Sequence, residues 1–293
     1  MVIVVTGASG LLGTALVRAL TEEGHEVVRL VRRAPRDPGE RTWDPTAKEP
    51  APGLLDGAQA VVHLAGAPIG RRWSAAVKRE IVRSRIDSTR LLTEAVRRTA
   101  TPPETLVSAS GIDFYGDTGE AVIDESTPRG TGFLAELCER WEQEARKVPA
   151  RSVQLRTGLV LSRDGGALGP MLPIFKLGLG APLGSGRQFW PWIAIDDWVG
   201  AVQHVLRTRE VSGPVNVVGP DPVRNRDFTR ELTAALRRPM MPIPVPRLAL
   251  GLALGDFARE ALLSSHRARP KKLEDSGYAF RHTRLDGALA AVL

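Results

Sequence analysis

The chain opens with two different patterns of apolar positions. Residues 2–5 are consecutive β-branched apolar residues, which is typical of a parallel strand buried on both faces. Residues 14–23 carry apolar residues at helical spacing and are followed by Gly24, so they predict a helix. A further apolar run at 27–31 predicts a second strand.

The same alternation continues along the chain. Apolar runs predict strands at 60–66 (with its turn), 105–110, from 152, and at 215–218, and helical periodicity predicts helices at 75–98, 133–147 and 198–206. Alternating strands and helices are typical of an α/β fold with a doubly wound parallel sheet of the Rossmann type.

The composition changes in the second half of the chain. Residues 34–57 predict a loop with one weak strand near 43–45, after which the strand–helix pattern resumes. Residues 165–186 are dense in Gly, Pro and Leu, and proline interrupts the helical pattern after Asn225. We therefore expect a core at 1–162, completed by about 190–222, and a smaller substrate-side lobe at 163–189 and 223–293 that ends in a helical subdomain.

A glycine-rich turn joins the first strand to the first helix. In this turn Gly7 permits a tight bend, Gly10 permits close approach of a pyrophosphate, and Gly13 permits close packing of helix and strand. The N–H groups and the dipole of the helix N-terminus favour phosphate. We expect a dinucleotide to contact Thr6, Gly7, Ser9, Gly10, Leu11, Leu12 and Gly13.

The end of the second strand favours NADP(H) over NAD(H). An NAD-binding chain usually has an acidic residue there for the ribose 2′-hydroxyl, whereas this chain has Val31 followed by Arg32 and Arg33. A guanidinium pairs with a 2′-phosphate that a carboxylate would repel. The alternative is that both arginines are solvated loop charges.

Composition excludes several other classes of function. No apolar run predicts a membrane span, and the first strand leaves no room for a signal peptide, so we expect no membrane partner and a cytoplasmic location. The single cysteine excludes an internal disulfide, and no ligand spacing predicts a metal site. The net charge of +7 comes from scattered arginines rather than a basic tract, so we expect no nucleic-acid partner.

These motifs resemble a known family. Residues 6–13, His63-Leu64-Ala65-Gly66, a strand-end serine and Tyr115-Gly116 resemble the extended short-chain dehydrogenases/reductases. Further motifs are similar to the atypical, epimerase-like subgroup of the SDR39U1 and YfcH type: residues 63–69, 84–86, 133–138, 141–142, 165–168, 184–188, 192–193 and 196–197, with a C-terminal helical domain from 242 to 293. The resemblance covers nearly the whole chain.

The resemblance implies a function and a wider set of cofactor contacts. It implies an NADP(H)-dependent oxidoreductase or epimerase-like enzyme with a small carbonyl, hydroxyl or sugar-like substrate. It also implies a possible homodimer through helices 75–98 and 133–147. The additional cofactor contacts that it implies are His63, Leu64, Ala65, Gly66, Arg85 and Ser108, with His63 positioning the backbone, whereas the contact of Arg33 is expected from the end of the second strand.

The chain departs from the family where proton transfer occurs. The family uses a Tyr and a Lys four residues apart on one helix, and the matching positions here read Leu134 and Cys138. Leucine transfers no proton, and a neutral thiol does not replace an ammonium. The family's helix asparagine corresponds to Arg85, and only the strand-end serine, Ser110, remains.

The remaining candidates define an altered catalytic site. We expect Tyr115 to donate a proton, Ser110 to hold the substrate oxygen and Arg85 to stabilise negative charge, with Cys138 nearby. Asp113 and Lys176 are further neighbours. Structural alternatives remain open: a strand end for Ser110, pocket lining for Tyr115, a buried thiol for Cys138, and for Arg85 an ion pair with a helix neighbour, Asp87 or Glu80.

The altered site leaves two functions open. The retained Ser110 and Tyr115 favour an enzyme, whereas Leu134 and Cys138 favour a sensor or interaction protein that binds NADP(H) without turnover.

Other conspicuous residues have structural interpretations. We expect Trp190, Trp192 and Trp198 to pack the lobe against the core, and Asp196 and Asp197 to cap the helix that follows them.

Overall fold

The computed structural model describes all 293 residues and contains one central parallel sheet. The sheet has seven strands in the order β12-β7-β5-β4-β1-β2-β3, and every pair is parallel. The strands are β1 (Val2–Thr6), β2 (Glu26–Val31), β3 (Glu40–Thr42), β4 (Ala60–His63), β5 (Thr105–Gly111), β7 (Arg151–Thr157) and β12 (Gly213–Val217). The strand order reverses between β1 and β4, which is where a doubly wound sheet binds its ligand. The predicted fold class is confirmed.

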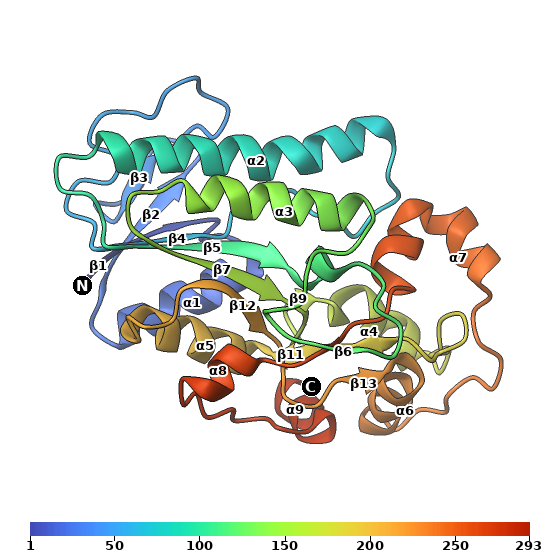
Figure 1. Cartoon of the computed structure of the whole chain (residues 1–293). Helices are drawn as coiled ribbons and strands as arrows, with labels where there is room; N and C mark the ends of the chain where they lie inside the picture. Colours follow the sequence, from blue (N-terminus) through green and yellow to red (C-terminus); the bar gives the residue numbers. More distant parts are fainter.

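Helices cover both faces of the sheet (Figure 1). Helices α1 (Leu11–Glu22) and α5 (Ile195–Arg207) pack on one face, and α2 (Ala75–Arg98) and α3 (Phe133–Arg146) pack on the other. Side chains of β1 alternate between the two layers, with Val5 in the cluster of α1 and α5, and Val4 in the cluster of α2 and α3. Because both faces are buried, the strand reads as an uninterrupted apolar run.

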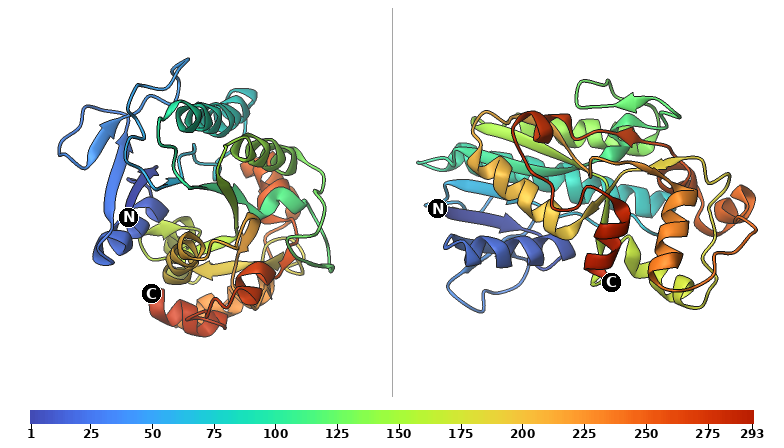
Figure 2. Two further views of the ribbon diagram at one scale, coloured as in Figure 1. Left: turned by 60° about the vertical axis from the view of Figure 1, so that its left-hand side comes forward. Right: turned by 90° about the horizontal axis from the view of Figure 1, so that it is seen from below.

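The remaining elements form a second layer of structure beside the sheet. Figure 1 shows α7 beyond the arrowheads of the central strands, and Figure 2 shows α9, at the C-terminus, beside α6. These elements are η1 (Ile112–Tyr115), β6 (Val122–Ile123), β8 (Leu159–Ser162), β9 (Gly165–Gly166), α4 (Leu168–Lys176), β10 (Phe189–Trp190), β11 (Trp192–Ala194), β13 (Val223–Arg224), α6 (Asn225–Ala235), α7 (Arg247–Leu254), the π-helical turn η2 (Ala258–Leu262), β14 (Arg267–Ala268), α8 (Lys271–Asp275) and α9 (Leu285–Val292).

The three tryptophans are buried in two apolar clusters, whereas the predicted packing of a lobe against the core stays a prediction. Trp190 and Trp192 belong to the apolar cluster of the lobe, and Trp198 belongs to the main cluster under the sheet. All three are buried, and each fills its own cluster with a large apolar surface.

Two helices begin three residues earlier than predicted, and one of the differences changes a residue's role. Helix α1 begins at Leu11, and α5 begins at Ile195, which places Asp197 inside the first turn of α5. The carboxylate of Asp197 accepts hydrogen bonds from the N–H groups of Arg281 (2.7 Å) and His282 (2.9 Å). The prediction that Asp197 caps its own helix is therefore wrong, because the carboxylate anchors the C-terminal segment instead.

The outer faces of α2 and α3 are polar. The large apolar side chains that are exposed are Met1, Val122, Ile174, Leu177, Leu179, Met241, Ile243, Leu248 and Leu252, and none of them lies on α2 or α3. The predicted homodimer through these helices would therefore have no apolar surface to bury between its subunits, and it stays a prediction.

Every helix in the structure is too short or too polar to cross a lipid bilayer.

We predict that Gly13→Ala strongly destabilises the protein. A β-carbon at this position would collide with the carbonyl oxygen of Gly7 and with the backbone of Ala8. Rigid backbone atoms cannot move aside as a flexible side chain can, so the free energy of unfolding should fall by at least about 2 kcal/mol in urea denaturation. Gly287→Ala is the control, because Gly287 is an exposed helical glycine with open space around it. Its replacement should leave the free energy of unfolding unchanged or raise it by about 0.5–1 kcal/mol. Equal effects of the two substitutions would contradict the prediction.

Candidate functional site

The loops after β1 and β4 are pressed together at the point where the strand order reverses. Gly7 has a φ of +69°, and a β-carbon there would lie 2.8 Å from the carbonyl carbon of Leu64. The hydroxyl of Thr6 accepts hydrogen bonds from the N–H groups of Leu64 (3.2 Å) and Ala65 (3.3 Å). Thr6 is fully buried, so its side chain ties the two loops together rather than facing a ligand.

The N-terminus of α1 fits a pyrophosphate. Its N-cap residue, Gly10, has no side chain to bond the first N–H groups, and the first turn contains no acidic residue. Ser9 and Gly10 are exposed, whereas the side chain of Leu11 faces β9, 3.1 Å from the position that a β-carbon would take at Gly166. Free N–H groups and an uncompensated helix dipole are the chemistry that binds phosphate groups.

His63 is held in place on both sides of its ring. Its Nδ1 lies 2.6 Å from the hydroxyl of Thr6, and its Nε2 lies 3.1 Å from that of Thr89. Complete burial lowers the pKa of the imidazole to about 3, and the Arg85 guanidinium contributes. His63 therefore stays neutral and supports the loop after β4.

The two arginines after β2 differ in their surroundings. Arg33 donates to both carboxylate oxygens of Glu40, each at 2.7 Å, and this pairing lowers the pKa of Glu40 to about 2. Arg32 is exposed and makes no hydrogen bond or ion pair. Arg32 can therefore bind an anion, whereas the guanidinium of Arg33 is already paired with Glu40.

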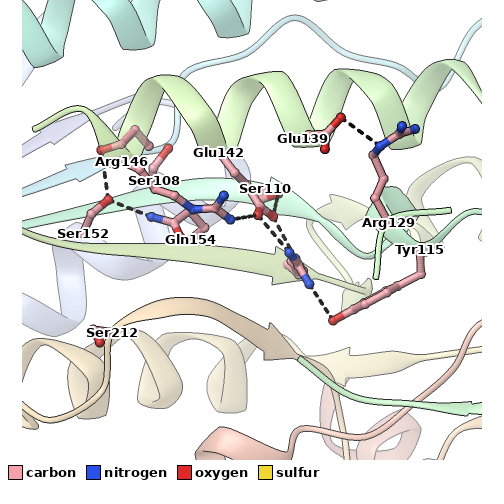
Figure 3. A network of polar contacts seen from close by, with 12 residues as sticks. Ser108, Ser110, Tyr115, Arg129, Glu139, Glu142, Arg146, Ser152, Gln154 and Ser212 are labelled. Carbon is pink, nitrogen blue, oxygen red and sulfur yellow. Dashed lines mark hydrogen bonds and ion pairs between the residues drawn. The ribbon is translucent and has the colours of Figure 1, made fainter. Parts of the chain in front are cut away.

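Two predicted catalytic residues lie in a buried polar network (Figure 3). The hydroxyl of Ser110 donates to Glu142 (2.9 Å), and Arg156 donates to both carboxylate oxygens of Glu142 (2.7 and 2.9 Å). Arg156 also donates to the hydroxyl of Tyr115 (2.8 Å), which in turn donates to the side-chain oxygen of Asn216 (2.8 Å). Burial raises the pKa of Tyr115 to about 12.

This network occupies the hydroxyls of Ser110 and Tyr115 within the protein. Tyr115 uses its donor and an acceptor lone pair on buried partners, and Ser110 is 7% exposed. The geometry therefore favours the structural alternative for both residues. Sequence reasoning missed Glu142 and Arg156, although each is a charged residue on an otherwise apolar helix face or strand, and such a residue needs a partner.

Ser108 is also turned into the protein. It lies within β5 with no exposed surface, and its hydroxyl donates to the carbonyl of Ala109 (3.2 Å). The structure therefore gives its side chain no surface for the cofactor contact that we expected.

Arg85, Asp113 and Cys138 gather at the carboxyl end of β5. A β-carbon at Gly111 would lie 3.3 Å from Asp113 Oδ2 and 3.4 Å from Cys138 Sγ. The guanidinium of Arg85 lies against Gly66 in the loop after β4 and donates to the carbonyl of Ala67 (3.0 Å). The cluster therefore spans the carboxyl ends of β4 and β5, close to the glycine-rich turn.

Arg85 has no acidic partner within ion-pair distance. The two helix neighbours that were its alternative partners bind other arginines: Asp87 pairs with Arg90 (3.0 Å) and Glu80 with Arg71. All of its hydrogen bonds are made by Nη1. The donors on Nε and Nη2 therefore make no hydrogen bond within the protein.

Asp113 faces a cavity and has an altered acidity. The cavity has a volume of about 260 Å³, and its lining includes Asp113, Leu134 and Glu260. Burial, with a contribution from Glu260, raises the pKa of Asp113 to about 6. Burial also raises the pKa of the Cys138 thiol to about 12, so this cysteine stays neutral. Lys176, a predicted neighbour, does not line this cavity.

Family models match two parts of the chain. Residues 3–155 match the NAD dependent epimerase/dehydratase family, and residues 245–292 match DUF1731, a domain of unknown function. Among curated relatives, the chain is 44% identical to the epimerase family protein Mb2239 of Mycobacterium bovis, over 98% of this chain and 96% of that protein. It is 38% identical to the human epimerase family protein SDR39U1, over the full length of both.

Solved structures agree with these matches. The crystal structure of human epimerase family protein SDR39U1 (isoform 2) with NADPH superimposes with a TM-score of 0.91 at 36% identity, covering 100% of this chain and 99% of that chain. The UDP-N-acetylglucosamine 4-epimerase from Bacillus cereus has a TM-score of 0.76 at 20% identity, covering 100% of this chain and 98% of that one. The second similarity shows the fold alone.

We predict that Glu142→Gln destabilises the protein by about 3 kcal/mol, because it leaves the buried Arg156 without its charged partner. The matched control is Glu139→Gln on the same helix, which breaks a half-exposed pair with Arg129 that should contribute less than about 1 kcal/mol. Urea denaturation measures both. A loss in Glu142→Gln no larger than that in the control would contradict the prediction.

Proposed function

The chain belongs to the NAD dependent epimerase/dehydratase family, and on this premise we propose that it is an NADP(H)-dependent oxidoreductase or epimerase-like enzyme with altered acid–base groups. The observation that carries the proposal is that Asp113, which lines the cavity, and Arg85, a guanidinium with unused donors, act on each other electrostatically beside the dinucleotide-binding turn. Its substrate would be a small carbonyl, hydroxyl or sugar-like molecule.

The residues that would hold the cofactor follow the geometry of the turn. The N–H groups at the start of α1 would bind the pyrophosphate, and Arg32 would bind the 2′-phosphate. Residues 64–66 would border the nicotinamide end, since they follow β4 at the reversal of strand order, and so would the guanidinium of Arg85, which lies against Gly66. The NADPH in the human SDR39U1 structure, whose fold matches over the full chain, supports this choice of cofactor.

The cluster at the end of β5 would supply the remaining chemistry. When bound, the nicotinamide ring of NADP(H) supplies or accepts a hydride. Arg85 would orient the substrate oxygen and stabilise its developing negative charge with the donors on Nε and Nη2. Asp113 would exchange the proton, because a carboxyl whose pKa is raised to about 6 works as both acid and base near neutral pH.

The other predicted catalytic residues take supporting roles in this proposal. Ser110 and Tyr115 would act as positioning residues through their bonds to Glu142 and Arg156. Leu134 lines the cavity and would exclude water from the reacting groups. Cys138 would pack beside Asp113 as a neutral thiol.

A second candidate function is binding of NADP(H) without turnover, as a sensor or interaction protein. The observation that favours it is that the hydroxyl of Tyr115 is engaged within the protein, while Leu134 and Cys138 offer no proton donor on α3. Exposure of the protein and NADPH to a panel of aldehydes, ketones and nucleotide sugars separates the two functions. Oxidation of NADPH with any compound supports the enzyme, and its absence with all of them supports binding alone.

A cytoplasmic location and a homodimer remain predictions.

We predict that Arg32→Ala weakens NADPH binding by about 10–100-fold, as expected for the loss of a charge-assisted contact to phosphate. NADH lacks the 2′-phosphate, so its affinity should change less than about 3-fold. Isothermal titration calorimetry measures both cofactors. Arg18→Ala is the control, since it removes the same charge from an exposed position on α1. Equal losses for NADPH and NADH in Arg32→Ala would show that Arg32 does not contact the phosphate.

We predict that Asp113→Asn lowers turnover with any active compound by about 10²–10⁴-fold, as expected for the loss of a general acid–base group. NADPH affinity should be retained, because the proposed phosphate contacts lie elsewhere. Asp87→Asn, which removes an exposed carboxylate from α2, should leave turnover unchanged. Full turnover in Asp113→Asn would exclude Asp113 as the proton donor.

A further inference from the structure

The C-terminal segment reaches back to the N-terminus of α3. The N-cap of that helix is Gly132, which has no side chain to bond the first N–H groups. Glu260, in η2, takes this role, because its Oε2 accepts a hydrogen bond from the N–H of Leu134 at 3.2 Å. A β-carbon at Gly132 would lie 2.6 Å from the same oxygen, so a larger residue there would displace this carboxylate from its present position.

Contacts on the neighbouring turns hold η2 in position. Asp256 Oδ2 pairs with Lys78 Nζ at the start of α2 (2.6 Å). The ring of Phe257 packs edge-on against Trp73, with 5.7 Å between the ring centroids. The backbone carbonyl of Glu260 accepts from the hydroxyl of Ser264 (2.8 Å). The carboxylate of Glu260 is therefore carried by a turn that is fixed to the core, and π-helical turns are frequent at functional sites.

Glu260 shares a cavity with Asp113. Both line the 260 Å³ cavity, together with Asp117 and Arg259. The charged and titratable groups that act on Asp113 come from three elements: Arg85 on α2, Cys138 on α3 and Glu260 on η2. A carboxylate near another carboxyl disfavours ionisation of both, whereas a guanidinium favours it. Glu260 therefore opposes the effect of Arg85 on the Asp113 carboxyl.

We propose that Glu260 is a positioning residue through which the C-terminal segment completes the catalytic cavity: its carboxylate fixes the first turn of α3 and poises Asp113 to exchange a proton. This inference rests on the proposed function, and it assigns a role to the region that matches a domain of unknown function, residues 245–292. The core alone would have neither the cap on α3 nor the second carboxylate beside Asp113.

The proposal is tested by titrating the Asp113 carboxyl in the full chain. Carbon-13 labelling of aspartate carboxyls makes the titration visible by NMR, and Asp113→Asn identifies the resonance by its loss. Glu260→Gln keeps an oxygen for the Leu134 N–H but removes the charge, so the midpoint of Asp113 should fall by about 0.5–1 pH unit. Glu136→Gln, in the exposed part of the same first turn of α3, is the matched control and should leave the midpoint in place.

A second variant keeps the test decisive if Glu260→Gln does not fold. Glu260→Asp retains the charge but shortens the side chain, so the Asp113 midpoint should stay within about 0.3 pH unit of the parent protein, while the Leu134 amide exchanges its hydrogen faster. An unchanged midpoint in folded Glu260→Gln would overturn the proposal. A fall of the midpoint to the ordinary aspartate value in Glu260→Asp would also overturn it.

The stability of the protein gives an independent readout of the same coupling. Because the pKa of Asp113 is raised to about 6, the folded state binds more protons than the unfolded state between about pH 4 and pH 6, and the free energy of unfolding falls as pH rises through this range. Glu260→Gln should make this fall smaller, and the proposal is overturned if the slope is unchanged. These measurements need neither cofactor nor substrate, so failure of the proposed enzyme activity would show separately, as an absence of NADPH oxidation.

Discussion

The buried ion pair between Glu142 and Arg156 links the parts of the protein that surround the site. Glu142 comes from α3 and Arg156 from β7, and both are almost fully buried. Glu142 also pairs with Arg146 on the same helix, and the remaining partners of the ion pair lie on β5, on η1 and, through Tyr115 and Asn216, on β12. A buried charge is stable only when it is paired and fully hydrogen-bonded, so each of these elements is held in one relative position. The cluster of Arg85, Asp113 and Cys138 lies directly beside this hydrogen-bonded network.

The residues on the inner face of α3 suggest why Asp113 would take over the proton transfer. In the family pattern a tyrosine and a lysine on the helix corresponding to α3 would exchange the proton, but Leu134 and Cys138 make this face apolar. An apolar, buried surrounding raises the pKa of a carboxyl. The residues at these two positions would therefore both withhold the usual acid and contribute to the buried environment that raises the pKa of Asp113 to about 6. Arg85 contributes a positive charge at the same place, with donors that no other side chain uses.

Much of the fold could be predicted because its signals are local. The apolar runs of β1, β4 and β5, the helical period of α2 and the glycines of the turn before α1 are properties of neighbouring residues, and they depend on backbone geometry that any environment would enforce. The starts of α1 and α5 were predicted less accurately, since neither helix begins with a side-chain cap that would mark its first residue. The partners of a residue in the first turn can also lie far along the chain. Asp197 illustrates this, because its partners at 281 and 282 follow it by more than eighty positions.

The sequence by itself determined the sheet class, the dinucleotide-binding turn, and the absence of a tyrosine and a lysine at positions 134 and 138, because residue type and spacing suffice for these features. Only the tertiary structure decided which polar side chains are available. The sequence favoured Ser110 and Tyr115 as catalytic residues and gave Asp113 only as a neighbour, yet Glu142, Arg156 and Asn216 occupy the first two and none of them contacts the third. Glu260 reaches Leu134 across 126 positions. Hydrogen-bond partners separated so widely are selected by packing, and no local pattern in the chain encodes them.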